Sequence, residues 1–299
     1  MSRARPLALA LGCGVWGCGV SAPSSSPAGG DAGLVPSAPG VTALVGEVHL
    51  HQFPGGTHAW TAIVDRDIPP AFASKDSITE IDTVVSSQEG PCTLYTSPTC
   101  TPDCAGATYC FAPDSCQPLP EWPYIDGGEV DVTGSSVVPR IRMWWDTAAA
   151  TYVSDPAPGG PELFAGGETL HLAGGTGDHA FTFDVPAPKP IALSTPDPMS
   201  DLHLVPGALE VAWTSGIADS VEVIVVAQAS TGAQGEIRCV TTDSGSLTIP
   251  ADLMNAIPPP PRQTSFQILR NNERIAPVAR AGAGLFIHAG QTTWIQGVD

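Results

Sequence analysis

Prolines limit what this chain can fold into more than any other feature of its sequence. The 299 residues include 31 prolines, which interrupt nearly every stretch long enough for three helical turns. A long helical bundle and a coiled coil are therefore excluded. One short helix is expected at residues 250–256, because proline is tolerated at the start of a helix and the prolines from Pro258 to Pro261 end it.

Apolar residues alternate with polar ones from residue 44 onward, between clusters of Gly, Pro, Asp and Ser. The segments 47–50, 141–145, 181–185, 209–213 and 221–225 show this period of two. Successive side chains of a strand point to opposite faces, and only one face meets the core. Several short strands separated by turns are typical of sandwiches, so the sequence predicts an all-β fold.

The N-terminal segment has the features of an export signal. Arg3 and Arg5 precede an apolar stretch of eleven residues, 7–17, which has the length of a signal-peptide core and is too short for a membrane span. Cys18 follows this stretch directly. The residues 15–18, VWGC, resemble the lipobox of bacterial lipoproteins, although a tryptophan stands where that family prefers a small residue.

The lipobox resemblance implies that residues 1–18 are a lipoprotein signal peptide and anchor, with Cys18 acylated. Cys13 is a rival anchor, and ordinary signal-peptidase cleavage after Ala22 is the alternative to lipidation. Residues 19–41 consist mostly of Gly, Ser, Pro and Ala, so we expect a disordered linker. Gly19 lacks the Asp that retains some lipoproteins in the inner membrane. By that analogy the protein is expected in the outer membrane of the bacterial cell envelope.

The prolines of the segment 186–190 predict a boundary between two β-sandwich domains, 42–188 and 189–299. The second domain has the length of an immunoglobulin-like sandwich. Its order is a proline-rich entry, a strand with Trp213, a valine-rich strand, and the strand 235–239 followed by a glycine turn. In this order it resembles the C-terminal immunoglobulin-like domains of uncharacterised bacterial surface lipoproteins.

Cysteine spacing predicts a disulfide-stapled insert at 92–118 in the first domain. In an exported protein disulfides are the default, and the insert has too few apolar residues for its own core. Bridges inside the segment 100–116 are favoured, and Cys239 is either a partner of the cluster or a buried free thiol. A zinc site is the alternative, but the spacing lacks paired C-x2-C knuckles. The six cysteines are Cys92, Cys100, Cys104, Cys110, Cys116 and Cys239.

The sequence offers two kinds of weak candidate site for a cation, one of histidines and one of acidic residues. His49 and His51 share one face of a strand, with His58 beyond a glycine turn, so the three could ligate a metal, although solvent-facing histidines on an edge hairpin are the preferred interpretation. The acidic groups at 65–67, 126–131 and 177–178 could supply oxygen ligands for Ca²⁺, although solvated turns are preferred.

Three aromatic residues, Trp122, Tyr124 and Trp144, are a possible binding face for a glycan or a protein. Trp144 is out of phase with Met143 and Trp145, so it should point away from the core of its strand. Exposed Trp and Tyr rings offer flat surfaces to sugar rings or protein partners. Packing of the cysteine-rich insert onto the strand is the alternative and is preferred.

The sequence contains no catalytic residue that we would name. The segment 242–245, TDSG, resembles a serine-protease nucleophile loop but lacks the surrounding glycines. The chain has 30 acidic and 12 basic side chains and a net charge of −18, so nucleic acid is not an expected partner. We therefore expect a non-enzymatic, lipid-anchored structural or interaction module, with a glycan- or Ca²⁺-binding module as the alternative and a hydrolase as the third.

Overall fold

The computed structural model of the chain describes residues 38–298, apart from 54–55, 69–83, 97–99, 101–103, 105–107, 113, 119–123, 201 and 231–232. Cys13, Cys18, Trp122 and the linker to residue 37 lie outside the described residues, so the predictions for them stay predictions.

The largest element is an eight-stranded sheet in the order β2-β1-β18-β17-β14-β15-β4-β3. Its neighbours pair antiparallel except β1 and β18, which are parallel. Its strands are β1 (Ala43–Phe53), β2 (Gly56–Ile68), β3 (Val84–Glu89), β4 (Cys92–Thr96), β14 (Ser220–Ala229), β15 (Gln234–Thr241), β17 (Arg262–Pro277) and β18 (Ala283–Val298).

Three smaller sheets complete the strands. A five-stranded sheet has the order β11-β10-β7-β8-β9, a three-stranded sheet the order β12-β13-β16, and β5 pairs with β6. Their bounds are β5 (Thr108–Ala112), β6 (Ser115–Pro118), β7 (Val130–Thr133), β8 (Ile141–Asp146), β9 (Thr151–Asp155), β10 (Thr169–Gly174), β11 (Phe181–Pro186), β12 (Leu193–Thr195), β13 (Leu209–Trp213) and β16 (Ser246–Ile249).

The expected short helix is present as α1 (Ala251–Ala256), with Pro250 at its N-cap, and a 3-10 turn spans Gly177–His179. Leu253 and Met254 of α1 are buried. In the described ranges no helix has the length and apolar character needed to span a membrane.

Two large hydrophobic cores hold the sheets together, as the alternating pattern requires, and Leu44, Ile275 and Phe286 form a third, small cluster. In the first core, residues of β1 and β18 such as Val48 and Ile287 pack with the five-stranded sheet, which contributes Met143 and Leu172. In the second core, β14, β15 and β17 pack with the three-stranded sheet and α1. The predicted all-β fold class, built of β-sandwich layers with a disulfide-bridged cysteine-rich insert, is confirmed.

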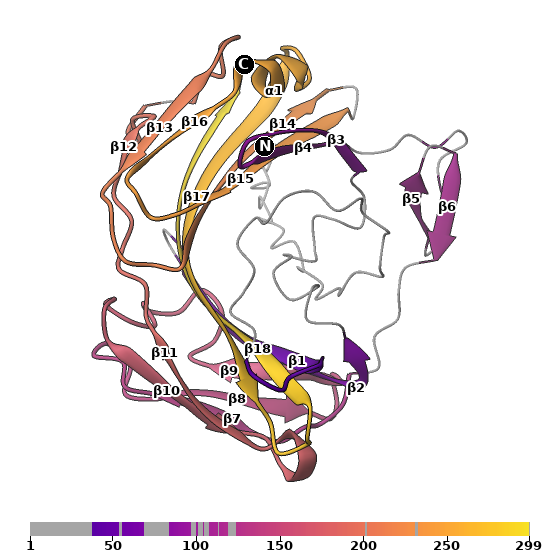
Figure 1. Cartoon of the computed structure of the whole chain (residues 1–299), viewed down its shortest axis with the longest axis vertical. Coiled ribbons are helices and arrows are strands. Elements are labelled where there is room, and N and C mark those ends of the chain that lie inside the picture. Colours follow the sequence, from indigo (N-terminus) through magenta and orange to yellow (C-terminus); the bar gives the residue numbers. More distant parts are fainter. Residues whose placement is uncertain are drawn as a thin grey trace, which may run out of the picture.

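The two long strands β17 and β18 run through both halves of the molecule (Figure 1). Ala276, near the end of β17, belongs to the first core, whereas Phe266 and Ile268 belong to the second. Strand β4, from the first predicted domain, pairs with β15 of the second. Strands from either side of residue 188 therefore share one sheet. The division of the chain into two domains at 188/189 stays a prediction.

The proline-rich segment at that boundary is fixed to β17. Asn272 Nδ2 donates to the Pro186 carbonyl at 2.8 Å, and Arg270 Nη1 donates to the carbonyls of Lys189 and Pro190 at 3.1 and 3.0 Å. Arg270 also pairs with buried Asp243 at 2.8 Å. The segment is therefore bound along the sheet rather than held only at its two ends.

Candidate functional site

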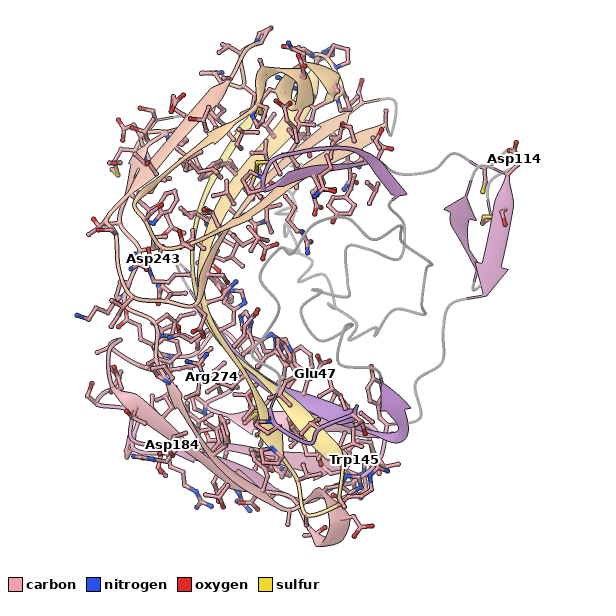
Figure 2. All side chains as sticks on the ribbon, viewed as in Figure 1. Glu47, Asp114, Trp145, Asp184, Asp243 and Arg274 are labelled. Atoms are coloured by element: carbon pink, nitrogen blue, oxygen red, sulfur yellow. A yellow bond between two sulfur atoms is a disulfide. The ribbon has the colours of Figure 1, made fainter. Side chains whose placement is uncertain are left out.

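One face of the eight-stranded sheet carries polar residues although its other face packs on the two cores. Val48 and Leu50 of β1 point into the first core, so His49 and His51 lie on the opposite face, which we call the polar face. Glu47 of β1, which is labelled in Figure 2, lies on the polar face as well. The ladder places His288 beside His49, and Glu273 beside His288. The polar face thus joins residues far apart in sequence.

Four histidines gather on the polar face beside the first core, and we call them the histidine cluster: His49, His51, His58 and His288. The His49 ring stacks on Trp60 with centroids 4.1 Å apart and planes 5° apart. It also stacks on His288 at 5.1 Å, and His51 meets His288 edge-on at 5.9 Å. Because His49 and His288 are buried, the preferred expectation of solvent-facing histidines on an edge hairpin is wrong for His49.

Carboxylates accompany the two buried rings of the cluster. His49 Nε2 lies 3.1 Å from a carboxylate oxygen of Glu47, and His288 Nδ1 lies 3.3 Å from one of Glu273. His51 Nε2 contacts the Thr292 hydroxyl. Burial lowers the pKa of His58, and the charge of nearby His49 lowers it further. The cluster therefore favours uncharged His58, and its stability should depend on pH.

The histidine cluster does not form a preassembled metal site. In the part of the chain that the structure describes, one group of three His, Cys, Asp or Glu residues has its ligand atoms within 4.8 Å of one another, and it consists of Cys100, Cys104 and Cys116. The histidine nitrogens instead face carboxylate and hydroxyl oxygens on their own sheet. The arrangement is that of a packed polar cluster.

A second polar feature, which we call the amide groove, opens on the polar face beside the second core. Its volume is about 690 Å³. Two ladder rows form its floor: Ser265 lies between Val226 and Gln296 in one, and Gln228 lies beside Gln263 in the other. The amide groove is lined by His203, Val226, Gln228, Gln263, Thr264, Ser265, Gln296 and Gly297.

Trp294 extends the amide groove along β18. It lies two residues before Gln296 on the same face, which is roughly 7 Å along a strand. Its side chain is 42% exposed, and its ring lies 5.7 Å from that of Phe53. An exposed, supported indole thus continues the polar floor of the groove.

Gly297 is required at the end of the groove. A Cβ there would lie 2.0 Å from the carbonyl oxygen of Leu202, so the backbone of residue 202 rests directly on the strand. This contact places the next residue, His203, at the wall of the groove. The close approach of two backbones therefore shapes the groove.

Arg238 lies on the polar face between two buried carboxylates. Its guanidinium is 3.2 Å from Glu222 and 3.1 Å from Glu236, and it lies 6.0 Å from the centroid of the Tyr95 ring. All three charged side chains are buried. Buried carboxylates need such a partner, so Arg238 holds this part of the sheet together.

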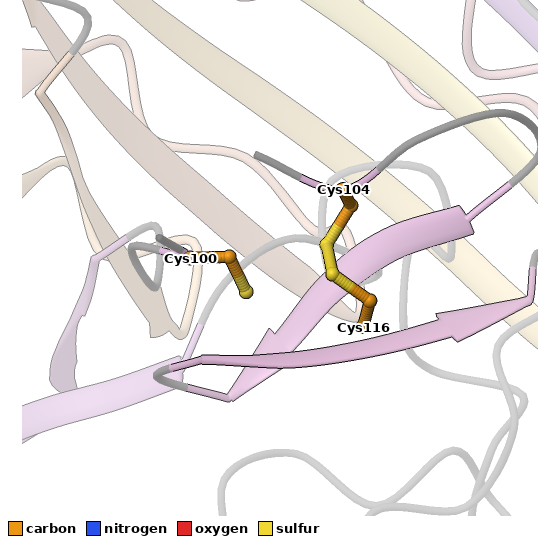
Figure 3. Close-up of side chains that lie close together, drawn as sticks. All are labelled: Cys100, Cys104 and Cys116. Carbon is orange, nitrogen blue, oxygen red and sulfur yellow. A yellow bond between two sulfur atoms is a disulfide. The ribbon is translucent and has the colours of Figure 1, made fainter. Parts of the chain in front are cut away.

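The cysteine-rich insert is oxidised. Cys104 and Cys116 form a disulfide (Figure 3), and Cys100, whose sulfur lies beside theirs, is disulfide-bonded as well. Thiolates for zinc are therefore absent from this group of three. Cys239 forms a disulfide with Cys92, its ladder neighbour, so of its two alternatives the bridge to the cluster is present. The side chain of Cys110 lies outside the described residues.

The aromatic face predicted from the sequence is not assembled as a binding surface in the described residues. Trp144 does point away from the core, but it is half-buried and the Arg142 guanidinium covers it at 5.3 Å from the ring centroid. Tyr124 is also half-buried, and Trp122 lies outside the described residues. The exposed tryptophan with a groove beside it is instead Trp294.

Two of the acidic residues considered for Ca²⁺, Glu129 and Asp131, have arginine partners. Arg140 pairs with Asp131 at 2.5 Å, and Arg142 pairs with Glu129. The hydrogen bond from Arg142 is the main cause of the lowered pKa of Glu129. The side chains of 65–67 lie outside the described residues. Carboxylates already neutralised by arginine are poor calcium ligands, which fits the preferred interpretation as solvated turns.

The segment 242–245 forms no nucleophile site. Asp243, labelled in Figure 2, is buried and accepts hydrogen bonds from Trp213 Nε1 at 3.0 Å and from Arg270 at 2.9 Å. Burial by itself would raise the pKa of Asp243, but the hydrogen bonds from Arg270 and Trp213 outweigh it and lower the pKa. Ser244 donates to the Ser246 carbonyl. Asp243 therefore serves to fix β13 to β17.

Sequence reasoning missed His288, Glu273, Trp294 and Gln296. All four lie on the long strands β17 and β18. The alternation continues through 288, 290, 292, 294 and 296, and this was the available signal. Which residues lie beside these positions depends on the pairing of β18 with β1, which the sequence does not reveal.

No family model and no curated protein matches this sequence. Among solved structures, the FN1–FN3 domains of chicken CNTN1 match with 11% identity and a TM-score of 0.21, over 73% of this chain and 64% of that one. A two-domain fibronectin type-III segment from chicken tenascin matches with 15% identity and a TM-score of 0.18, over 70% of this chain and 96% of that one. The chain thus spans less than two thirds of the length of the first match.

Proposed function

We propose that this protein is a non-enzymatic binding module of the bacterial cell envelope, and that its ligand site is the amide groove with Trp294. The observation that carries the proposal is an exposed tryptophan beside an open groove of about 690 Å³, a volume within the usual range of ligand sites. In the described ranges the residues considered as a nucleophile loop are occupied in structural bonds. Binding is therefore favoured over catalysis.

The oxidised cysteines support an extracytoplasmic setting. Cys92, Cys100, Cys104, Cys116 and Cys239 are all disulfide-bonded. Disulfides persist in oxidising compartments and are rare in the cytosol. Together with the lipobox-like segment ending at Cys18, this supports export followed by attachment to the outer membrane through acyl chains on Cys18.

The anchoring part of the proposal is tested with the full chain expressed in a bacterium and labelled with an alkyne analogue of palmitate. We expect label on the wild-type chain and on Cys13→Ser, and loss of label with release from the membrane for Cys18→Ser. Density fractionation should place the labelled chain in the outer membrane. An unlabelled mature chain that begins at Pro23 would contradict lipidation, because it would show ordinary cleavage after Ala22.

A further inference from the structure

We infer that the amide groove binds a neutral carbohydrate chain, which rests on the proposed binding role of the groove and names its ligand class. The lining contains no Asp, Glu, Lys or Arg, in a chain whose net charge is −18. A lining without these four residue types offers no permanent counter-charge to an anion and no carboxylate to a cation. The ligand that fits this surface is uncharged.

The lining groups match hydroxyl-rich ligands. Gln228, Gln263 and Gln296 are exposed, and each amide carries an acceptor oxygen and two N–H donors. Ser265 adds a hydroxyl beside Gln296, in the row next to that of Gln228 and Gln263. Sugar hydroxyls are donors and acceptors at once, so an amide can satisfy them in pairs. Val226 supplies an apolar patch of floor on which the C–H face of a sugar ring can lie.

Thr264 borders the groove but faces the other side of the sheet. It alternates with Gln263 and Ser265 and shares its face with Phe266 of the second core. Its Oγ1 is buried and makes no hydrogen bond, but it points away from the polar face and is not a contact for a ligand there.

Trp294 extends the site beyond one sugar unit. The indole lies along the strand from Gln296, it is 42% exposed, and Phe53 supports it. Flat aromatic faces stack on the apolar faces of sugar rings. Beyond Gln291, β18 pairs with β17 alone in the described sheet, and the side of β18 that faced β1 has no strand. A carbohydrate chain can enter from that side. The geometry thus suits an oligosaccharide lying across the strands.

The test is isothermal titration of the full chain, with Cys18→Ser for solubility, against maltohexaose, cellohexaose, chitohexaose and laminarin, with polygalacturonate as a charged comparison. We expect at least one neutral chain to bind and polygalacturonate not to bind. Trp294→Ala and Gln296→Ala should each weaken binding about tenfold or more, a loss of roughly 1.4 kcal/mol. Trp144→Ala, a tryptophan on the other sheet, is the matched control and should bind as the parent does.

Thr264→Val is a second control, because this side chain faces the second core rather than the polar face. Removal of its unsatisfied buried hydroxyl should leave the melting temperature unchanged or raise it, and sugar affinity should stay that of the parent. Unchanged affinity in Trp294→Ala and Gln296→Ala, or binding of the charged polymer alone, would overturn the inference.

A second measurement separates the inference from the proposed function. Absence of binding to every neutral chain, together with binding of an extended peptide that Trp294→Ala abolishes, would overturn the carbohydrate inference and leave the binding module intact. Absence of both kinds of binding would overturn the proposed site as well. The palmitate labelling is unaffected by either result, so failure of the anchor is recognised separately.

Discussion

The two halves of the polar face share strands β17 and β18 but have opposite character. Beside the first core, the histidine cluster is packed, aromatic and close to carboxylates. Beside the second core, the amide groove is open and uncharged. The difference follows from β1, which pairs with β18 only as far as Gln291 and supplies side-chain neighbours such as His49 and His51 to that half alone. Neighbouring strands, rather than the alternation within a strand, therefore decide whether a polar face is packed or accessible.

The largest effect is expected from the removal of a buried charge. It tests whether buried charged residues contribute more to the stability of the polar face than exposed groove residues do. Arg238→Met leaves Glu222 and Glu236 buried without their partner, so we expect a loss of about 3–5 kcal/mol in unfolding free energy. Gln263→Met, exposed on the same face, is the matched control and should change stability by less than about 0.5 kcal/mol. Urea unfolding measures both. Equal effects of the two variants would show that the packed and open regions do not differ in this way.

An intermediate effect is expected when one glycine from each half of the polar face is replaced by alanine. In Gly297→Ala the new Cβ meets the Leu202 backbone, so we expect a loss of about 1–3 kcal/mol. In Gly290→Ala it meets the ring of His288 at 2.4 Å, and a ring can rotate away, so the loss should be about 1 kcal/mol. Thermal unfolding of the two variants measures the difference. A larger loss for Gly290→Ala would mean that the histidine cluster is more rigid than the groove wall.

The smallest effect is on the pH dependence of stability. Because the folded pKa of His58 lies below its ordinary value of 6.5, the unfolded chain binds a proton more readily. Below about pH 6.5 the unfolded state gains protons first, so stability should fall as pH falls towards the lowered folded pKa. Urea unfolding between pH 7.5 and 5 should show a shallower slope for His58→Gln than for the parent. Gln263→Ala, which removes no titrating group, should keep the parental slope.

Local features of this fold were readable from the sequence. The period of two located strands such as 141–145 and 221–225, and the prolines around Ala251–Ala256 bounded the helix. The exclusion of long helices followed from the same residues. These predictions depend only on near neighbours along the chain, which is why they succeeded.

Contacts between distant segments were not readable. The parallel pairing of β1 with β18 joins His49 to His288, and the disulfide joins Cys92 to Cys239 across 147 residues. Nothing in a single sequence indicates which strands pair across such distances. The glutamines of the groove were missed for a related reason, since an exposed amide acquires meaning only from the residues beside it.

The parallel pairing of β1 and β18 has a mechanical consequence if the chain is tethered at its N-terminus. A pull towards the membrane enters at the Ala43 end of β1, while a load on the groove acts near the opposite end of β18. The two forces then slide the strands past one another, so the hydrogen bonds between them must break together instead of one after another. This molecule should therefore resist stretching between its anchor and its ligand better than it would if β1 peeled away from one end.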